Sequence, residues 1–118
     1  MFIIHVKRVY DPASDDDGAR LLVDRLWPRG ESKEKAALTE WVKDAAPSTG
    51  LRVWFGHDPV KWEEFRKRYC AELDNRSEVI ARLLDYARRG PITLLVGARD
   101  TEHNEAVVLA DYLREKLK

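Results

Sequence analysis

The stretch at residues 92–96 constrains the fold more than any other part of this sequence. It is Ile-Thr-Leu-Leu-Val, and it is bounded by Gly90-Pro91 on one side and by Gly97 on the other. A short apolar run between turn signals is typical of a strand buried on both faces, as strands of parallel sheets are. Parallel strands need long crossover connections, which are usually helices. Residues 92–96 therefore favour an α/β fold with a parallel sheet.

The remaining sequence alternates predicted strands with predicted helices. Strands are predicted at residues 2–9 and 19–26, and helices at residues 50–56, 58–73, 77–89 and 102–117. A helical turn is predicted at residues 32–35, whereas residues 37–44 fit either a strand or a helix. This order predicts a three-layer α/β/α architecture with a small, mostly parallel sheet of about four strands. We expect residues 1–118 to form a single domain, because that length suits one core.

Composition narrows the class of protein. Charged residues make up 36% of the chain but balance to a formal net charge of zero, so the whole molecule offers no bulk attraction to nucleic acid or membrane. The single cysteine, Cys70, excludes an intramolecular disulfide. Residues 1–10 lack the pattern of a signal peptide, and no apolar stretch approaches the roughly 20 residues that span a bilayer. We expect a cytoplasmic protein without a membrane partner.

Unusual residues gather where the predicted strands end. In open parallel sheets, ligands bind beyond the carboxyl ends of the strands. The segment Asp24-Arg25-Leu26-Trp27-Pro28-Arg29 follows one such strand, and a Trp, a Pro and two Arg are costly in an ordinary turn. The candidate ligand-binding residues at the predicted strand ends are Arg8, Arg25, Trp27, Arg29, Lys43, Ser48 and Arg52, and the candidate catalytic residue is Asp24.

These residue types suit an anionic ligand. Arginine binds carboxylate or phosphate through a bidentate fork, so Arg25, Arg29 and Arg52 are expected to clamp the anion. Trp27 offers a stacking surface for a base or another ring. Asp24 is expected to orient an arginine or to accept a proton. For Asp24 and Arg25, a purely structural interpretation stands beside the ligand-binding one. In that interpretation Asp24 pairs with Arg25 or Lys43, and the ion pair serves stability alone.

Other kinds of site find little support in the sequence. The three histidines, His5, His57 and His103, lack metal-ligand spacing, and His57 is interpreted as a polar turn residue. Cys70 has no visible activating partner. No phosphate-binding loop or dinucleotide motif occurs. The sequence therefore predicts no metal site and no cofactor.

A resemblance to a known family covers nearly the whole chain. It is carried by the segments 22–30, 41–44, 46–49, 51–55 and 57–59, by Lys33, and by Phe65, Arg68-Tyr69 and Glu72-Leu73. This series resembles the YeaO-like branch of domain-of-unknown-function family 488. The resemblance implies a compact α/β protein with a strand carrying Asp and Arg. It implies no particular reaction, and all eight candidate residues match the YeaO-like pattern.

One departure from the wider family bears on chemistry. The wider family's pattern includes a Cys-x-Glu strand end followed by a Cys-His-Arg triplet, whereas the corresponding segment here is Val-Gly-Ala-Arg-Asp-Thr-Glu-His-Asn-Glu at residues 96–105. A mechanism that uses that cysteine is therefore not carried over.

Two functional hypotheses remain open. In the first, the protein is a ligand-binding domain or an enzyme for a phosphorylated or nucleotide-like ligand, held in a basic, Trp-containing cleft. In the second, it is a non-enzymatic module that binds nucleic acid or another protein; the zero net charge argues mildly against nucleic acid, whose affinity comes mostly from phosphate neutralisation.

Overall fold

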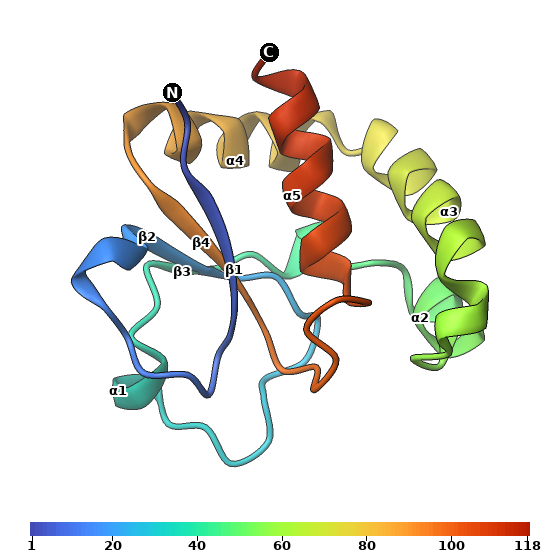
Figure 1. Cartoon of the computed structure of the whole chain (residues 1–118), viewed down its shortest axis with the longest axis horizontal. Helices are drawn as coiled ribbons and strands as arrows, with labels where there is room; N and C mark the ends of the chain where they lie inside the picture. The colour runs from blue at the N-terminus through green and yellow to red at the C-terminus, as the bar shows by residue number, and fades with distance from the viewer.

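A computed structural model describes all residues from Met1 to Lys118 (Figure 1). The strands are β1 (Ile4–Arg8), β2 (Ala19–Leu22), β3 (Glu40–Trp41) and β4 (Ile92–Val96). The α-helices are α1 (Lys33–Ala36), α2 (Thr49–Phe55), α3 (Trp62–Asp74), α4 (Ser77–Arg89) and α5 (Glu105–Lys116). Three single turns of 3-10 helix lie at Asp15–Asp17, Lys43–Ala45 and Pro59–Lys61.

The four strands form one sheet in the order β1-β4-β2-β3, and every pairing is parallel. Strand β4 lies between β1 and β2, and all five of its residues are buried. The predicted α/β class, the parallel sheet and the doubly buried strand at residues 92–96 are therefore confirmed.

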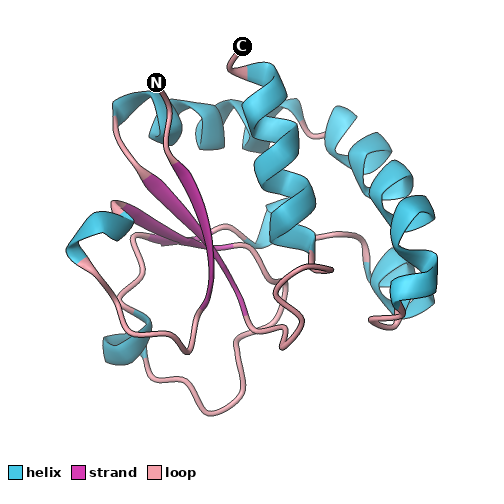
Figure 2. Cartoon of the chain, viewed as in Figure 1, coloured by secondary structure: helices cyan, strands magenta, loops and turns pink.

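The two faces of the sheet are covered unequally (Figure 2). Leu21, Leu94 and Val96 belong to the main core, which also takes its side chains from α2, α3, α4 and α5. On the opposite face, Leu22 and Leu95 pack in a small cluster of four buried residues with one side chain from α1. One helical layer is thus thick, whereas the other consists of one short helix and the loops around it.

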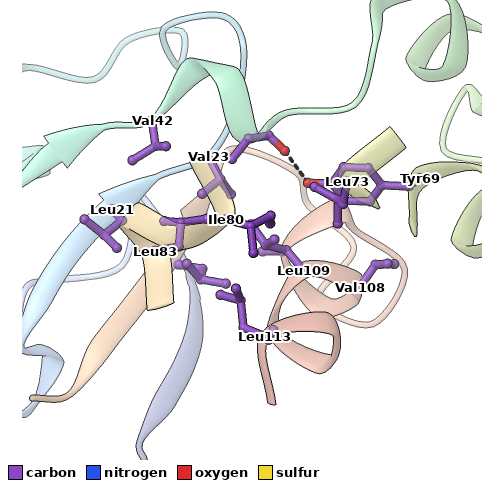
Figure 3. Close-up of a cluster of buried hydrophobic side chains, with 14 of the residues drawn as sticks. Leu21, Val23, Val42, Tyr69, Leu73, Ile80, Leu83, Val108, Leu109 and Leu113 are labelled. Atoms are coloured by element: carbon purple, nitrogen blue, oxygen red, sulfur yellow. Dashed lines mark hydrogen bonds between the residues drawn. The ribbon is translucent and has the colours of Figure 1, made fainter. Parts of the chain in front are cut away.

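Tyr69 joins the main core to the loop that follows β3 (Figure 3). Its ring, on α3, is fully buried, and its hydroxyl donates a hydrogen bond to the carbonyl of Ala45. Burial is the main reason why the pKa of Tyr69 lies well above its usual range. The segment just before α2 is therefore tied to α3 by a buried polar contact as well as by packing.

Some predicted boundaries were wrong for local reasons. The strand predicted to reach residue 26 ends at Leu22, because only Val23 continues the pairing with β4 before the chain turns away. The last helix begins at Glu105 rather than near residue 102, because the side chain of Asn104 accepts the N–H of Val107 and caps the helix there. The ambiguous residues 37–44 supply β3 and the start of a 3-10 turn.

None of the helices combines the length and the apolar composition that crossing a membrane requires.

Candidate functional site

After the neighbouring strands β2 and β4, the chain turns to opposite faces of the sheet. After β2 it runs to α1, whose Ala36 packs on the thin face of the sheet. After β4 it runs to α5, which packs on the thick face. Such a topological switch point opens a crevice at the carboxyl ends of the two strands, and this is where open α/β sheets bind ligands.

A cavity of about 280 Å³ lies at this switch point. Its walls come from the segment after β2, from the segment after β4 including the start of α5, and from α2 and α3. Four charged side chains line it, those of Asp24, Arg25, Arg52 and Glu105. Its apolar and aromatic lining includes Leu26, Trp27, Pro28, Pro47, Phe55 and Phe65, with His57 beside them.

Asp24 is fixed from two sides. Its Oδ2 atom accepts the backbone N–H of Gly97 at 2.8 Å, and its carbonyl accepts the indole N–H of Trp41 at 2.7 Å. A methyl group at position 97 would lie 3.3 Å from that same Oδ2 atom, so glycine allows the close approach. The first residue beyond β4 therefore holds the carboxylate that follows β2.

Arg25 is held by backbone carbonyls rather than by a carboxylate. Its Nη2 atom donates to the carbonyl oxygens of Ala46 and Pro47 at 3.4 and 3.3 Å, and both contacts are long. Its Nε atom is buried and has no hydrogen-bond partner. The guanidinium thus keeps an unused donor while its position is already fixed.

Glu105, the first residue of α5, carries the second unused group. Its Oε2 atom is buried without a partner. Burial, and next the hydrogen bond and charge of Asp24, raise the pKa of the Glu105 carboxyl well above its usual range. The positive charges of Arg25 and Arg52 oppose part of this rise. The Glu105 carboxyl therefore holds its proton to a higher pH than an ordinary glutamate does.

The unpaired groups of Arg25 and Glu105 lie in the wall of the same cavity. Arg25 Nε and Glu105 Oε2 are the only buried side-chain nitrogen or oxygen atoms in the chain that lack a partner. Both residues line the same cavity. Buried polar groups in folded proteins are almost always hydrogen-bonded, so one unpaired donor and one unpaired acceptor set this cavity apart from the rest of the chain.

Strain marks another residue of the cavity wall. His57 has a backbone φ of 58°, in the left-handed region that a non-glycine residue rarely adopts. Its ring lies 6.1 Å from that of Phe55, another lining residue. Strained residues persist where the surrounding structure holds them, and they cluster at functional sites. The sequence treats His57 as an ordinary turn residue, and nothing in its local context signals this conformation.

Half of the residues predicted from the sequence line the cavity: Asp24, Arg25, Trp27 and Arg52. The other four have different contacts. Arg8 donates through Nε to the carbonyl of Ala98 at 2.9 Å, and Ser48 caps α2 and donates to Glu72 at 2.5 Å. The ammonium of Lys43 lies 4.1 Å from the centre of the Trp41 ring. Arg29 is exposed, and its carbonyl accepts the hydroxyl of Tyr10 at 2.8 Å.

The ion pairing considered for Asp24 does not occur. No salt bridge joins it to Arg25 or to Lys43; instead, the buried pair lies between Asp17 and Arg20, with N···O at 2.5 Å and both side chains 5% exposed. Sequence reasoning also missed Glu105, because a glutamate in the first turn of a helix is usually a solvated residue that interacts favourably with the helix dipole.

Comparison with known proteins identifies the family. A family model described as the inactive DUF488-N3 subclade matches residues 3–118. The uncharacterized protein YeaO of Escherichia coli (strain K12) is 51% identical over 111 residues, which cover 94% of this chain and 96% of that protein. The uncharacterized protein Rv3073c of Mycobacterium tuberculosis (strain ATCC 25618 / H37Rv) is 40% identical over 110 residues, covering 93% and 92% of the two chains. No solved structure matches. The chain belongs to the DUF488 family, as its sequence motifs predict.

Proposed function

We propose that this member of the inactive DUF488-N3 subclade is a binding domain for a small phosphorylated or nucleotide-like anion, held in the cavity between β2 and β4. The observation that carries the proposal is the buried, unpaired Nε donor of Arg25 in a cavity that Arg52 also lines. An anionic oxygen is the strongest partner available to such a donor, because charge-assisted hydrogen bonds are about twice as strong as neutral ones.

The size and walls of the cavity favour a small molecule over a polymer. Ligand pockets for drug-sized molecules span roughly 300–1,000 Å³, and a volume of about 280 Å³ lies just below that range. Trp27 supplies an apolar wall that is held in place: its indole N–H donates to the carbonyl of Glu31 at 2.9 Å, and its ring meets Trp41 edge-on at 5.3 Å. Such a preordered wall suits the flat or apolar part of a ligand.

Binding without chemistry agrees with both the family and the lining. The subclade is described as inactive. No serine, threonine, tyrosine, cysteine or lysine is among the fifteen residues that line the cavity, so no hydroxyl, thiol or amine is placed to attack a bound ligand. In this proposal Asp24, the catalytic candidate of the sequence, is a positioning group.

A thermal-shift series with inorganic phosphate, pyrophosphate and nucleoside monophosphates tests the proposal. A ligand present at 100 times its Kd stabilises the folded state by about 2.7 kcal/mol, which is roughly 10 °C for a domain of this size. We expect Arg52→Ala and Arg25→Ala to abolish the shift.

Arg29→Ala is the matched control, because Arg29 belongs to the same sequence motif but does not line the cavity. It is expected to keep the full shift. A shift that survives both Arg25→Ala and Arg52→Ala, or none with any of these anions, would refute the proposal. A gel shift with single-stranded nucleic acid that weakens with salt would favour the nucleic-acid alternative instead.

A further inference from the structure

We infer that the cavity selects an aminated anion, a small molecule that carries a protonated amine as well as a phosphate or carboxylate. Asp24 and Glu105 would receive the ammonium group, while Arg25 and Arg52 hold the anionic group. This inference rests on the proposed function and names the ligand class of the same cavity.

The unpaired Oε2 atom of Glu105 favours a ligand that carries a hydrogen-bond donor. An anion without donors would pair the Nε atom of Arg25 and leave the buried Oε2 atom of Glu105 without a partner. It would also bring negative charge toward the carboxyl groups of Glu105 and Asp24. An unsatisfied buried polar group costs about 1–3 kcal/mol, so a ligand that carries a donor as well has a clear advantage.

The charges of the cavity lining favour the same class of ligand. Two carboxyl groups, Asp24 and Glu105, and two guanidinium groups, Arg25 and Arg52, line the cavity. While Glu105 holds its proton, the lining carries one net positive charge, and a phosphate monoester, with a charge of about −1.5 to −2 at pH 7, would leave part of its negative charge uncompensated in a partly enclosed space, which is costly. A zwitterionic ligand that presents each end to the opposite charges keeps the balance at both ends.

A proton links binding to these carboxyl groups. Burial and the adjacent Asp24 raise the pKa of Glu105, so its carboxyl holds its proton to a higher pH than an ordinary glutamate does. An ammonium group beside an ionised carboxylate favours the charged form. The ligand binds with its amine protonated, and Glu105 releases its own proton to the solvent. The positive ammonium group then faces the negative carboxylate of Glu105. Binding of an aminated anion should therefore release a proton that binding of the matching simple anion does not.

Isothermal titration calorimetry of the whole chain with O-phosphoethanolamine and with ethyl phosphate tests the inference, since these probes differ in the amine. We expect the aminated probe to bind at least tenfold more tightly, with proton release seen as a binding enthalpy that depends on the buffer. Glu105→Gln should remove the preference and the proton release, so that the variant no longer distinguishes the two probes.

Glu102→Gln, in the exposed turn before α5, is the matched control and should behave as wild type. If Glu105→Gln does not fold, Asp24→Asn removes the charge of the other carboxylate and should weaken the same preference. Equal affinity for the two probes, or a preference that persists in both variants, would overturn the inference while leaving the proposed function in place. Failure of both probes to bind would overturn the two together.

Discussion

Replacing Glu105 by Gln removes one titrating proton from the wall of the cavity and keeps nearly the same shape. Burial and the neighbouring Asp24 carboxylate raise the pKa of the Glu105 carboxyl in the folded chain. The other charged or titratable groups around it are Arg25 and Arg52 in the cavity wall and Tyr69 on α3, whose own pKa Glu105 helps to raise; His57 lines the same cavity. The side-chain amide of Gln imitates the neutral carboxylic acid.

The sign of the effect follows from proton binding. Below the usual glutamate pKa, both the folded and the unfolded chains carry the proton, and the stabilising contribution is complete. As the pH rises toward the raised folded pKa, the unfolded chain releases its proton first. The folded state then binds more protons, so the free energy of unfolding falls with pH. One proton limits this slope to about 1.4 kcal/mol per pH unit, which is roughly 5 °C in Tm for a domain of this size.

The measurement is Tm and urea unfolding of wild type and Glu105→Gln from pH 4.5 upward in steps of half a unit. The difference between the two proteins isolates Glu105, because the other groups titrate in both. We expect the variant to gain stability relative to wild type as the pH rises, up to the raised folded pKa. Glu102→Gln, at an exposed position, should run parallel to wild type. Parallel curves for Glu105→Gln as well would show that this carboxyl is not held neutral by its surroundings.

Three further predictions concern the frame that carries the site. Asp17→Ala should lower the free energy of unfolding by about 3–5 kcal/mol in urea titrations, because it leaves the buried guanidinium of Arg20 without its carboxylate. Gly30→Ala, at φ 75° in open space, should cost about 1–2 kcal/mol. Gly18→Ala, at φ 64° with its methyl group 2.0 Å from a carbonyl oxygen just before β4, should cost clearly more, and equal losses would contradict the close contact. Tyr69→Phe should cost about 1–3 kcal/mol without changing ligand binding, because it leaves a buried carbonyl unpaired.

The fold was largely predictable, because its main signals are local. The apolar run at residues 92–96 and the helix at residues 77–89 have clear ends in the sequence, and both occur with the predicted bounds. The unequal covering of the sheet was not predictable, since it depends on how loops rather than periodic segments pack. The buried pair of Asp17 and Arg20 was missed for the same reason: an acidic, turn-rich segment has the composition of a solvated loop.

The site was predictable in outline only. The rule that ligands bind at strand ends pointed to Asp24 and Arg25, and both line the cavity. It failed to separate them from Arg8, whose guanidinium instead fastens the loop after β4 by a bond to a backbone carbonyl. Glu105 needed the three-dimensional structure, because only packing against the segment after β2 changes a helix-start glutamate into a buried one.

In the proposed function, the end of β4 lets this fold keep a binding site without a reaction. Residues 96–105 correspond to the segment with the Cys-x-Glu and Cys-His-Arg pattern that the resemblance implies for the wider family, and here Gly97 and Ala98 contribute backbone groups. The N–H of Gly97 holds the Asp24 carboxylate, and the carbonyl of Ala98 holds Arg8. This strand end therefore positions charged groups and presents no nucleophile of its own. In the proposed function, the unpaired donor on Arg25 and the unpaired acceptor on Glu105 at the switch point serve to recognise the ligand. Stabilisation by a ligand, rather than turnover, is accordingly the property by which the site should first be detected.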